Sequence, residues 1–465
     1  MRYYAYILGP ALLLMGACKK INIASPIDQL TTVEVFSDST SAEAAVLGIY
    51  SQINNINFST QHFLYGNVTL FPALSADELH RNTIDQVYTP FEQDAVQTDN
   101  SNNESNYQNA YSIIYQCNQV IQQLGLASSL ASTQVTRLTG EAKFLRALHY
   151  FYLTNEYGAV AMPLTSDYTT NVTLSRTDSA DVYKQIIEDL QDAEAETGTL
   201  YTTTGKVRAN RYAAAALLAR VYLYQKDYTD AITEASTVLS SGFYTLADPT
   251  QTFIPDNSEA ILQIMPPPTS QTLISTPEAE LFIPYPASYG IIPTYSLTPQ
   301  LVSSFEPGDL RRKDWTTDET INGVNYTSPY KYKIQYAFTS EEYEIALRLA
   351  DVILVRAEAE AFSSQLGPAI KDLDMVRGRA GLPLIGTTDP GISQGALEDT
   401  LYHERRIEFF TEWGHRWFDL KRTGLVNTVM TAMKGAQWTP TAVLYPIPQS
   451  ELLSAPNLSQ NPGYN

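Results

Sequence analysis

The hydrophobic pattern of the first half of the chain is helical from about residue 34 to residue 242. Apolar residues recur there at spacings of three and four, the period of an amphipathic helix that packs one face on a core. The pattern predicts helices over residues 42–53, 109–124, 140–157 and 181–195.

Two segments carry the pattern of paired antiparallel helices. In residues 207–242, small and apolar residues fall where two helices of a tetratricopeptide-type repeat would touch, with Tyr228 in the turn. A second pair is expected from Glu344 onward, with its first helix carrying Ile345 and Leu349 and its second helix ending before Gly381. Pairs of this kind stack into a superhelix with a concave surface.

The amino-acid composition changes between the two helix pairs, over residues 250–340. Ten of the 25 prolines lie between Pro255 and Pro307, a density that excludes regular long helices. Residues 330–334 alternate like a strand, and residues 401–422 are predicted to form one closing helix. The expected fold is therefore mostly α, a frame of tetratricopeptide-like helix pairs with an irregular, loop-rich part and short strands.

The first residues have the pattern of an export signal. Arg2 precedes an apolar run over residues 3–17, which is too short to cross a bilayer. Gly16 and Ala17 then precede Cys18, as in a bacterial lipobox, where the cysteine is acylated and becomes the first mature residue. We therefore expect a lipoprotein signal peptide over 1–17, a lipid attached to Cys18 and a polar tether over 18–33. A plain signal peptide with an incidental cysteine is the alternative.

Composition excludes some classes of partner. The formal net charge is −20, so nucleic acid and other polyanions would be repelled. Only two cysteines occur, so disulfides cannot stabilise the chain if Cys18 carries lipid. The other cysteine, Cys117, lies on the apolar stripe of a predicted helix and is expected to be a buried small hydrophobe.

Residues that could perform catalysis do not form a recognisable constellation. His403-Glu404 lacks the second histidine of a zinc-protease motif, and no nucleophile motif is present. The adjacent acids Asp77-Glu78 and Glu341-Glu342 would point in different directions, so neither pair is suited to glycoside hydrolysis. We expect a protein that is not an enzyme and uses no metal or cofactor.

Several motifs toward the end of the chain carry a family resemblance. They are residues 404–409 (ERRIEF), 412–422 (EWGHRWFDLKR), 445–451 (YPIPQSE) and 456–464 (PNLSQNPGY). Other matches run in order along the chain, among them Ala76-Asp77-Glu78, Asn118, residues 140–147 (GEAKFLRA) and residues 308–311 (GDLR). The chain resembles the SusD/RagB family of outer-membrane nutrient-binding lipoproteins over essentially its whole mature length.

The resemblance implies a function and a location. Members bind glycan or another oligomeric nutrient at the cell surface and deliver it to a SusC-like TonB-dependent transporter. It also implies a lipid-anchored outer-membrane protein with a SusD-like helical region over 34–242 and a SusD/RagB region over 243–465. The family motifs are expected to be architectural, with Arg416, Asp419 and Arg422 spaced to form a charge ladder on one helix.

The ligand site is expected in the loops, because sugar rings pack on exposed aromatic faces and bond to polar side chains at the edge. Two stretches have this composition, 80–107 and 285–332. The candidate ligand-binding residues are Tyr88, Trp315, Tyr289, Tyr295, Phe91, Arg81 and Asn102. Local loop packing is the alternative role of each of these residues.

Two other functions are compatible with the sequence. The protein could be a peptide-binding or ligand-free lid subunit of the transporter, as the RagB branch of the family suggests. It could also be a tetratricopeptide scaffold inside the cell, which lipid attachment at Cys18 would exclude.

Overall fold

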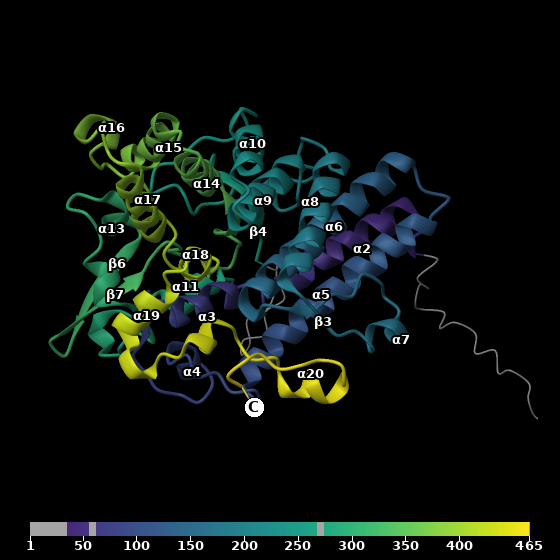
Figure 1. Ribbon diagram of the computed structural model, residues 1–465, viewed down its shortest axis with the longest axis horizontal. Helices are drawn as coiled ribbons and strands as arrows, with labels where there is room; N and C mark the ends of the chain where they lie inside the picture. Colours follow the sequence, from purple (N-terminus) through teal and green to yellow (C-terminus); the bar gives the residue numbers. More distant parts are fainter. Residues whose placement is uncertain (1–34, 55–61, 267–273, 465) are drawn as a thin grey trace, which may run out of the picture.

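The computed structural model describes residues 35–54, 62–266 and 274–464. Long helices run across the molecule, and short strands and loops lie among and beside them, with the strands of residues 316–329 toward the left-hand side (Figure 1). The predicted signal peptide 1–17, the tether 18–33 and Cys18 lie outside the described residues.

A continuous array of antiparallel helices makes up the frame. Each helix packs on the next one along the array, from α5 through α6, α8, α9 and α10 to α14, which contacts both α15 and α17. The array runs across the molecule in Figure 1, with α2 covering α5 and α6 at one end. The helices are α2 (Ser39–Ile53), α5 (Ser101–Leu126), α6 (Ser132–Tyr157), α8 (Ser179–Glu196), α9 (Arg211–Tyr224), α10 (Tyr228–Leu239), α14 (Leu349–Phe362), α15 (Leu366–Arg379) and α17 (Gln394–Glu408).

Local sequence explains the first predicted helix pair, which the structure confirms as α9 and α10. Four consecutive alanines, residues 213–216, are buried in α9 and let neighbouring helices approach closely. Asn210 caps α9 by accepting the N–H of Ala213, and Asp227 caps α10 by accepting the N–H of Asp230. Tyr228 is the first residue of α10, so the turn is shorter than the pattern suggested.

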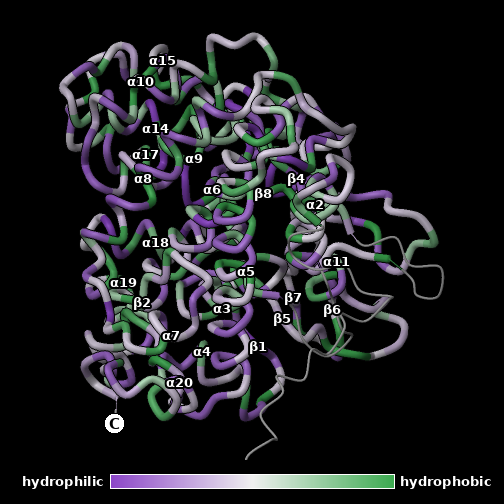
Figure 2. Tube along the Cα trace, turned by 90° about the vertical axis from the view of Figure 1, so that its right-hand side faces the viewer, coloured by the Kyte–Doolittle hydropathy of each residue, from purple (hydrophilic) through white to green (hydrophobic). Residues whose placement is uncertain are grey.

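Short strands and helices form the loop-rich part. The strands pair in twos and antiparallel, β1 (Leu79–Arg81) with β5 (Tyr295–Leu297), β2 (Val160–Ala161) with β3 (Arg176–Thr177), β4 (Ala260–Ile264) with β8 (Glu344–Arg348), and β6 (Thr316–Ile321) with β7 (Val324–Pro329). In Figure 2, α11 (Pro277–Phe282), β5, β6 and β7 gather on one side of the helical frame. The remaining short helices are α3 (Asn67–Ser75), α4 (Thr89–Glu92), α7 (Tyr168–Asn171), α12 (Pro299–Val302), α13 (Leu310–Asp314), α16 (Ile385–Thr388), α18 (His415–Arg422), α19 (Val426–Lys434) and α20 (Gln449–Ser454).

Two strand and helix assignments made from the sequence are wrong. The segment from Glu344 to Arg348 is strand β8 and not the first turn of a helix, because its backbone pairs with β4 and α14 begins only at Leu349. Residues 330–334 are not a strand, since the carboxylate of Glu342 accepts the backbone N–H groups of Lys333 and Ile334. The strand of this region is β7, immediately before that segment.

The predicted closing helix 401–422 is two helices, α17 and α18. Between them Thr411, Trp413 and Gly414 have positive φ angles of 48°, 43° and 68°. The turn places the ring of Phe409 on the ring of His415, with 4.4 Å between centroids. It also packs Gly414 against Pro72 of α3, so contacts with a distant segment break a helix that local periodicity favours.

Burial confirms the expected role of Cys117. It is a free thiol with no exposed surface, on the buried face of α5, and burial raises its pKa to about 12. The cysteine therefore packs as a small apolar side chain.

Candidate functional site

The antiparallel pair of β1 and β5 brings the two predicted loop stretches together. Arg81 lies opposite Tyr295 in this ribbon. The adjoining loops are joined by two hydrogen bonds, in which the backbone N–H of Asn82 donates to Thr294 O and its side-chain amide donates to Pro293 O, each at 2.9 Å. Residues about 210 positions apart in sequence thus form one surface.

Arg81 is the centre of this surface. Its guanidinium lies between two tyrosine rings, 5.0 Å from the centroid of Tyr88 and 5.1 Å from that of Tyr295, and donates to the Tyr295 hydroxyl at 2.5 Å. It also forms an ion pair with Asp85. The arrangement combines cation–π contact with charge pairing, which holds the Tyr88 ring in a defined orientation.

Asp85 shapes the loop that carries Tyr88. One carboxylate oxygen accepts the backbone N–H groups of Val87 at 2.8 Å and Tyr88 at 2.6 Å. Partial burial opposes ionisation, but these hydrogen bonds and the nearby Arg81 keep the pKa of Asp85 below its usual value. The loop is therefore stabilised by a charged carboxylate.

Exposed aromatic and aliphatic side chains flank the ribbon. Tyr289 is 67% exposed at the end of a short 3-10 turn, next to Gly290 in the left-handed conformation. Tyr285 and Ile291 on the same loop and Ile84 on the opposite loop are also exposed. We call this set, Arg81, Ile84, Tyr88, Tyr285, Tyr289 and Ile291, the loop surface. Sequence reasoning missed Ile84 and Ile291, because exposure of an aliphatic side chain has no sequence signal.

Asn102 lies beside this region, in the first turn of α5. Its backbone N–H donates to the capping side chain of Asn100, which in turn donates to Val87 O at 2.9 Å. The side-chain nitrogen of Asn102 is buried and has no hydrogen-bond partner among the described residues. Asn100 thus ties the Tyr88 loop to the frame, and Asn102 contributes only its backbone N–H to that cap.

Trp315 does not present a face to solvent. Its side chain has no exposed area, its indole N–H donates to Pro249 O at 2.8 Å, and its ring meets that of Phe253 edge to face. Lys331 and Arg379 lie over the same ring, at 4.8 and 5.3 Å. The expectation of an exposed Trp315 is wrong, because the tryptophan fills the core beneath the loop-rich part.

Tyr295 and Phe91 are also core residues. Phe91 is fully buried, stacked on Phe71 with 4.0 Å between centroids and edge-on to Tyr445 at 5.3 Å. Tyr295 is 3% exposed and meets the ring of Phe282. The expectation that these two rings are exposed is therefore also wrong, because both are packed in the core. Of the predicted aromatics, Tyr289 is open to a ligand and Tyr88 is partly so.

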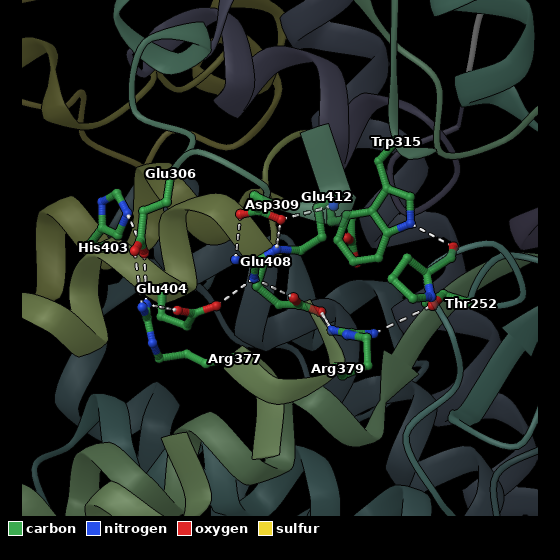
Figure 3. Close-up of polar contacts among 12 residues, drawn as sticks. Thr252, Glu306, Asp309, Trp315, Arg377, Arg379, His403, Glu404, Glu408 and Glu412 are labelled. Atoms are coloured by element: carbon green, nitrogen blue, oxygen red, sulfur yellow. Dashed lines mark hydrogen bonds and ion pairs between the residues drawn. The ribbon is translucent and has the colours of Figure 1, made fainter. Parts of the chain in front are cut away.

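The family motif residues on α17 lie in a buried charge network (Figure 3). Arg311 pairs with Asp309 at 2.9 Å and with Glu408 at 2.8 Å, and Arg377 pairs with Glu404 at 3.0 Å. Burial opposes the charge of Glu408, but three arginines, residues 379, 348 and 311, hold its pKa well below the usual value. The network joins α13, α15, β8 and α17, so these motifs support the architecture.

The expected charge ladder on α18 forms only in part. Arg422 donates to Asp419 at 2.7 Å, as the spacing predicts. Arg416 instead pairs with Asp77, at the end of α3. The ladder is therefore replaced by a long-range ion pair between two motifs.

The described part of the chain contains neither a cluster of metal-ligating side chains nor a membrane-spanning helix. No group of three or more His, Cys, Asp or Glu side chains there is placed to hold a metal ion. None of the helices in that part is long and apolar enough to span a bilayer.

The fold and the loop surface define a class of protein, a stacked-helix scaffold with an aromatic and charged face made by loops. Family models match two long segments of the chain. Residues 33–223 match a model described as "Starch-binding associating with outer membrane", and residues 298–464 match the SusD family model. The chain belongs to the SusD/RagB family.

Individual relatives agree with this assignment along the whole chain. A SusD-like protein of Formosa agariphila, P2, is 25% identical over 100% of both chains. The starch-binding protein SusD of Bacteroides thetaiotaomicron is 26% identical over 73% of this chain and 75% of its own. A SusD superfamily structure from Parabacteroides distasonis superposes with a TM-score of 0.78 at 25% identity, over 94% of this chain and 100% of that one. A laminarin-binding SusD-like structure has a TM-score of 0.74 at 23% identity, over 91% and 99% of the two chains.

Proposed function

We propose that this protein binds glycan, or another oligomeric nutrient, at the outer membrane and delivers it without chemical change to a SusC-like TonB-dependent transporter. Family membership supports the proposal, together with starch and laminarin as the ligands named for two relatives. The observation that carries it is the loop surface, which combines the exposed ring of Tyr289 with a Tyr88 ring that is oriented by the charged group of Arg81.

The chemistry of the loop surface suits a carbohydrate. Tyrosine rings offer flat apolar faces to the C–H groups of a sugar ring, and their hydroxyls bond at its edge. A guanidinium with five N–H donors can also bond to ligand hydroxyls, although Arg81 already uses some of them. A few exposed rings give weak binding, of about micromolar to millimolar dissociation constants, or roughly −4 to −8 kcal/mol.

Titration calorimetry with soluble starch, laminarin and other plant and host polysaccharides tests the proposal. We expect Tyr289→Ala and Tyr88→Ala to weaken the binding of the glycan that the unsubstituted protein binds. Tyr168→Ala is the matched control, since Tyr168 is 75% exposed on α7, outside the loop surface. Unchanged affinity in both loop variants would remove this surface as the site. Retention of an intact polysaccharide after long incubation checks that binding involves no hydrolysis.

Anchoring and partnership need separate experiments. We propose that Cys18 carries the lipid anchor, which predicts that Cys18→Ala releases the protein from the outer-membrane fraction and abolishes incorporation of labelled fatty acid. A transporter barrel should co-purify with the unsubstituted protein. Co-purification of a transporter with no glycan bound by either partner would favour the alternative, a peptide-binding or lid subunit.

A further inference from the structure

A cleft lies between the segments that follow α4 and α19. Its volume is about 350 Å³, within the range of about 300–1,000 Å³ that is typical of small-molecule sites. It is lined by two groups of residues, Asp94 to Thr98 on one wall, and Gln437, Thr439, Thr441, Ala442, Gly463 and Tyr464 on the other.

The second wall offers several unused hydrogen-bonding groups. The side chains of Gln437, Thr439 and Thr441 are exposed and form no hydrogen bond with any described residue. An amide has two donors and an acceptor, and each hydroxyl can both donate and accept. The wall can therefore bond to a ligand that presents several neutral polar groups.

Asp94, on the first wall of the cleft, belongs to a buried ion pair. Lys434 donates to Asp94 at 2.6 Å and to Ser75 O at 2.7 Å, and the side chain of Asp94 is only 1% exposed. The second carboxylate oxygen of Asp94, Oδ1, has no hydrogen-bond partner among the described residues. A buried acceptor without a partner is costly, so a donor group that reaches this oxygen would be stabilising.

Charge and shape select the class of ligand. The Lys434 charge compensates that of Asp94, and no other charged side chain lines the cleft, so a strongly anionic or cationic ligand gains little there. The half-buried ring of Tyr464, whose hydroxyl donates to Leu444 O at 2.7 Å, supplies one aromatic wall. Hydroxyls and amides beside one aromatic ring match a single sugar residue.

We propose that this cleft binds one neutral sugar residue, as a free monosaccharide or the end of a longer chain. The site is distinct from the loop surface, because none of the residues that line the cleft belongs to that surface. The inference therefore goes beyond the proposed function and does not require the loop surface to bind glycan.

Ligand-observed NMR titration with glucose, galactose and N-acetylglucosamine tests the cleft, using the whole mature chain. We expect at least one of these sugars to bind. Thr441→Val and Gln437→Ala should each lower the affinity for that sugar about fivefold, because each removes one neutral hydrogen bond of about 1 kcal/mol. Ala95→Phe, which adds a ring at the exposed rim, should abolish binding of the sugar.

The matched control is Thr136→Val, at an exposed threonine in the first turns of α6, which should leave sugar binding unchanged. Thermal melting of each variant checks that it folds. Failure of all three sugars to bind, or binding that survives both Ala95→Phe and Thr441→Val, would overturn the inference. If the sugars fail to bind but polysaccharide binding is still lost in Tyr289→Ala, the cleft inference fails while the proposed function stands.

Discussion

Arg416 forms a two-pronged ion pair with Asp77, from which it is separated by 339 residues in the chain. Its Nε donates to Oδ1 at 2.7 Å and its Nη2 to Oδ2 at 2.9 Å. Arg406 lies within ion-pair distance of the same carboxylate. Burial opposes ionisation of Asp77, but the charges of Arg416 and Arg406 lower its pKa and keep it ionised. The pair joins the end of α3 to α18 and so ties the two halves of the chain together.

Breaking this pair should destabilise the protein. Arg416→Met keeps the length of the side chain but leaves the buried Asp77 without its bidentate partner, so we expect a loss of about 3 kcal/mol in the free energy of unfolding. Chemical denaturation followed by circular dichroism measures it. The same substitution at Arg211, which makes a more exposed pair with Glu194, should cost less than about 1 kcal/mol. Equal effects of the two substitutions would contradict the structural role of Arg416.

Substitution of Trp315 should affect stability and not ligand contact. Trp315→Ala removes a fully buried ring that packs on Phe253, and should lower the free energy of unfolding by about 3–5 kcal/mol. Tyr289→Ala, at an exposed ring, should leave the unfolding midpoint unchanged. Denaturation curves and glycan titrations on both variants separate the two roles. If the Trp315→Ala protein kept its stability but no longer bound glycan, Trp315 would be a ligand-binding residue and not a core residue.

The buried Glu78 makes the stability depend on pH. Burial, with a contribution from the charge of Asp77, raises the pKa of Glu78 to about 8. Its folded-state pKa therefore lies above the unfolded value of about 4.3, and the folded protein holds a proton that the unfolded chain has lost. The stabilisation from this group is complete below the unfolded pKa and is lost as the pH rises toward 8.

Glu78→Gln tests this dependence, because the amide has nearly the same shape and does not titrate. Between about pH 5 and 8 the slope of unfolding free energy against pH should become less negative than in the unsubstituted protein, by at most ~1.4 kcal/mol per pH unit. Urea denaturation at a series of pH values gives both slopes. Parallel curves would show that Glu78 does not hold the proton.

Two glycines with similar backbone conformations allow the cost of backbone strain to be measured apart from the cost of a steric clash. Gly414 and Gly424 have φ angles of 68° and 76°, in the left-handed region, where an alanine costs roughly 1–2 kcal/mol. A Cβ at Gly414 would lie 2.7 Å from the ring of Phe418, whereas one at Gly424 would meet nothing within 4 Å. We expect Gly414→Ala to lower the free energy of unfolding by about 1–3 kcal/mol more than Gly424→Ala does. Similar losses in thermal or chemical denaturation would mean that the turn before α18 relaxes freely.

The long helices could be predicted because their periodicity is a local property. The stripes that indicated α5, α6, α8 and the pair α9–α10 are each buried against the next helix of the array. The errors fell where distant contacts override local preference. Pairing with β4 makes residues 344–348 a strand, and packing on α3 divides the predicted helix 401–422.

The candidate site was only partly predictable for a related reason. The sequence located both loop stretches by composition, and the β1–β5 ribbon brings them together. It could not rank the aromatics within them, since the exposure of a ring depends on what else packs around it. Trp315, the largest ring in the second stretch, fills the core, whereas Tyr289 lies in the open beside a glycine turn.

The order of apolar and small residues along the chain was enough to determine a stacked-helix body and the buried state of Cys117, and the residue identities in the motifs were enough to recognise the family resemblance. Periodicity and spacing are carried by neighbouring residues, so they can be seen before folding. Only the tertiary structure decided which charges pair, as Arg416 does with Asp77, and which polar groups are left to face a ligand. Both depend on segments hundreds of residues apart that meet only when the core has formed.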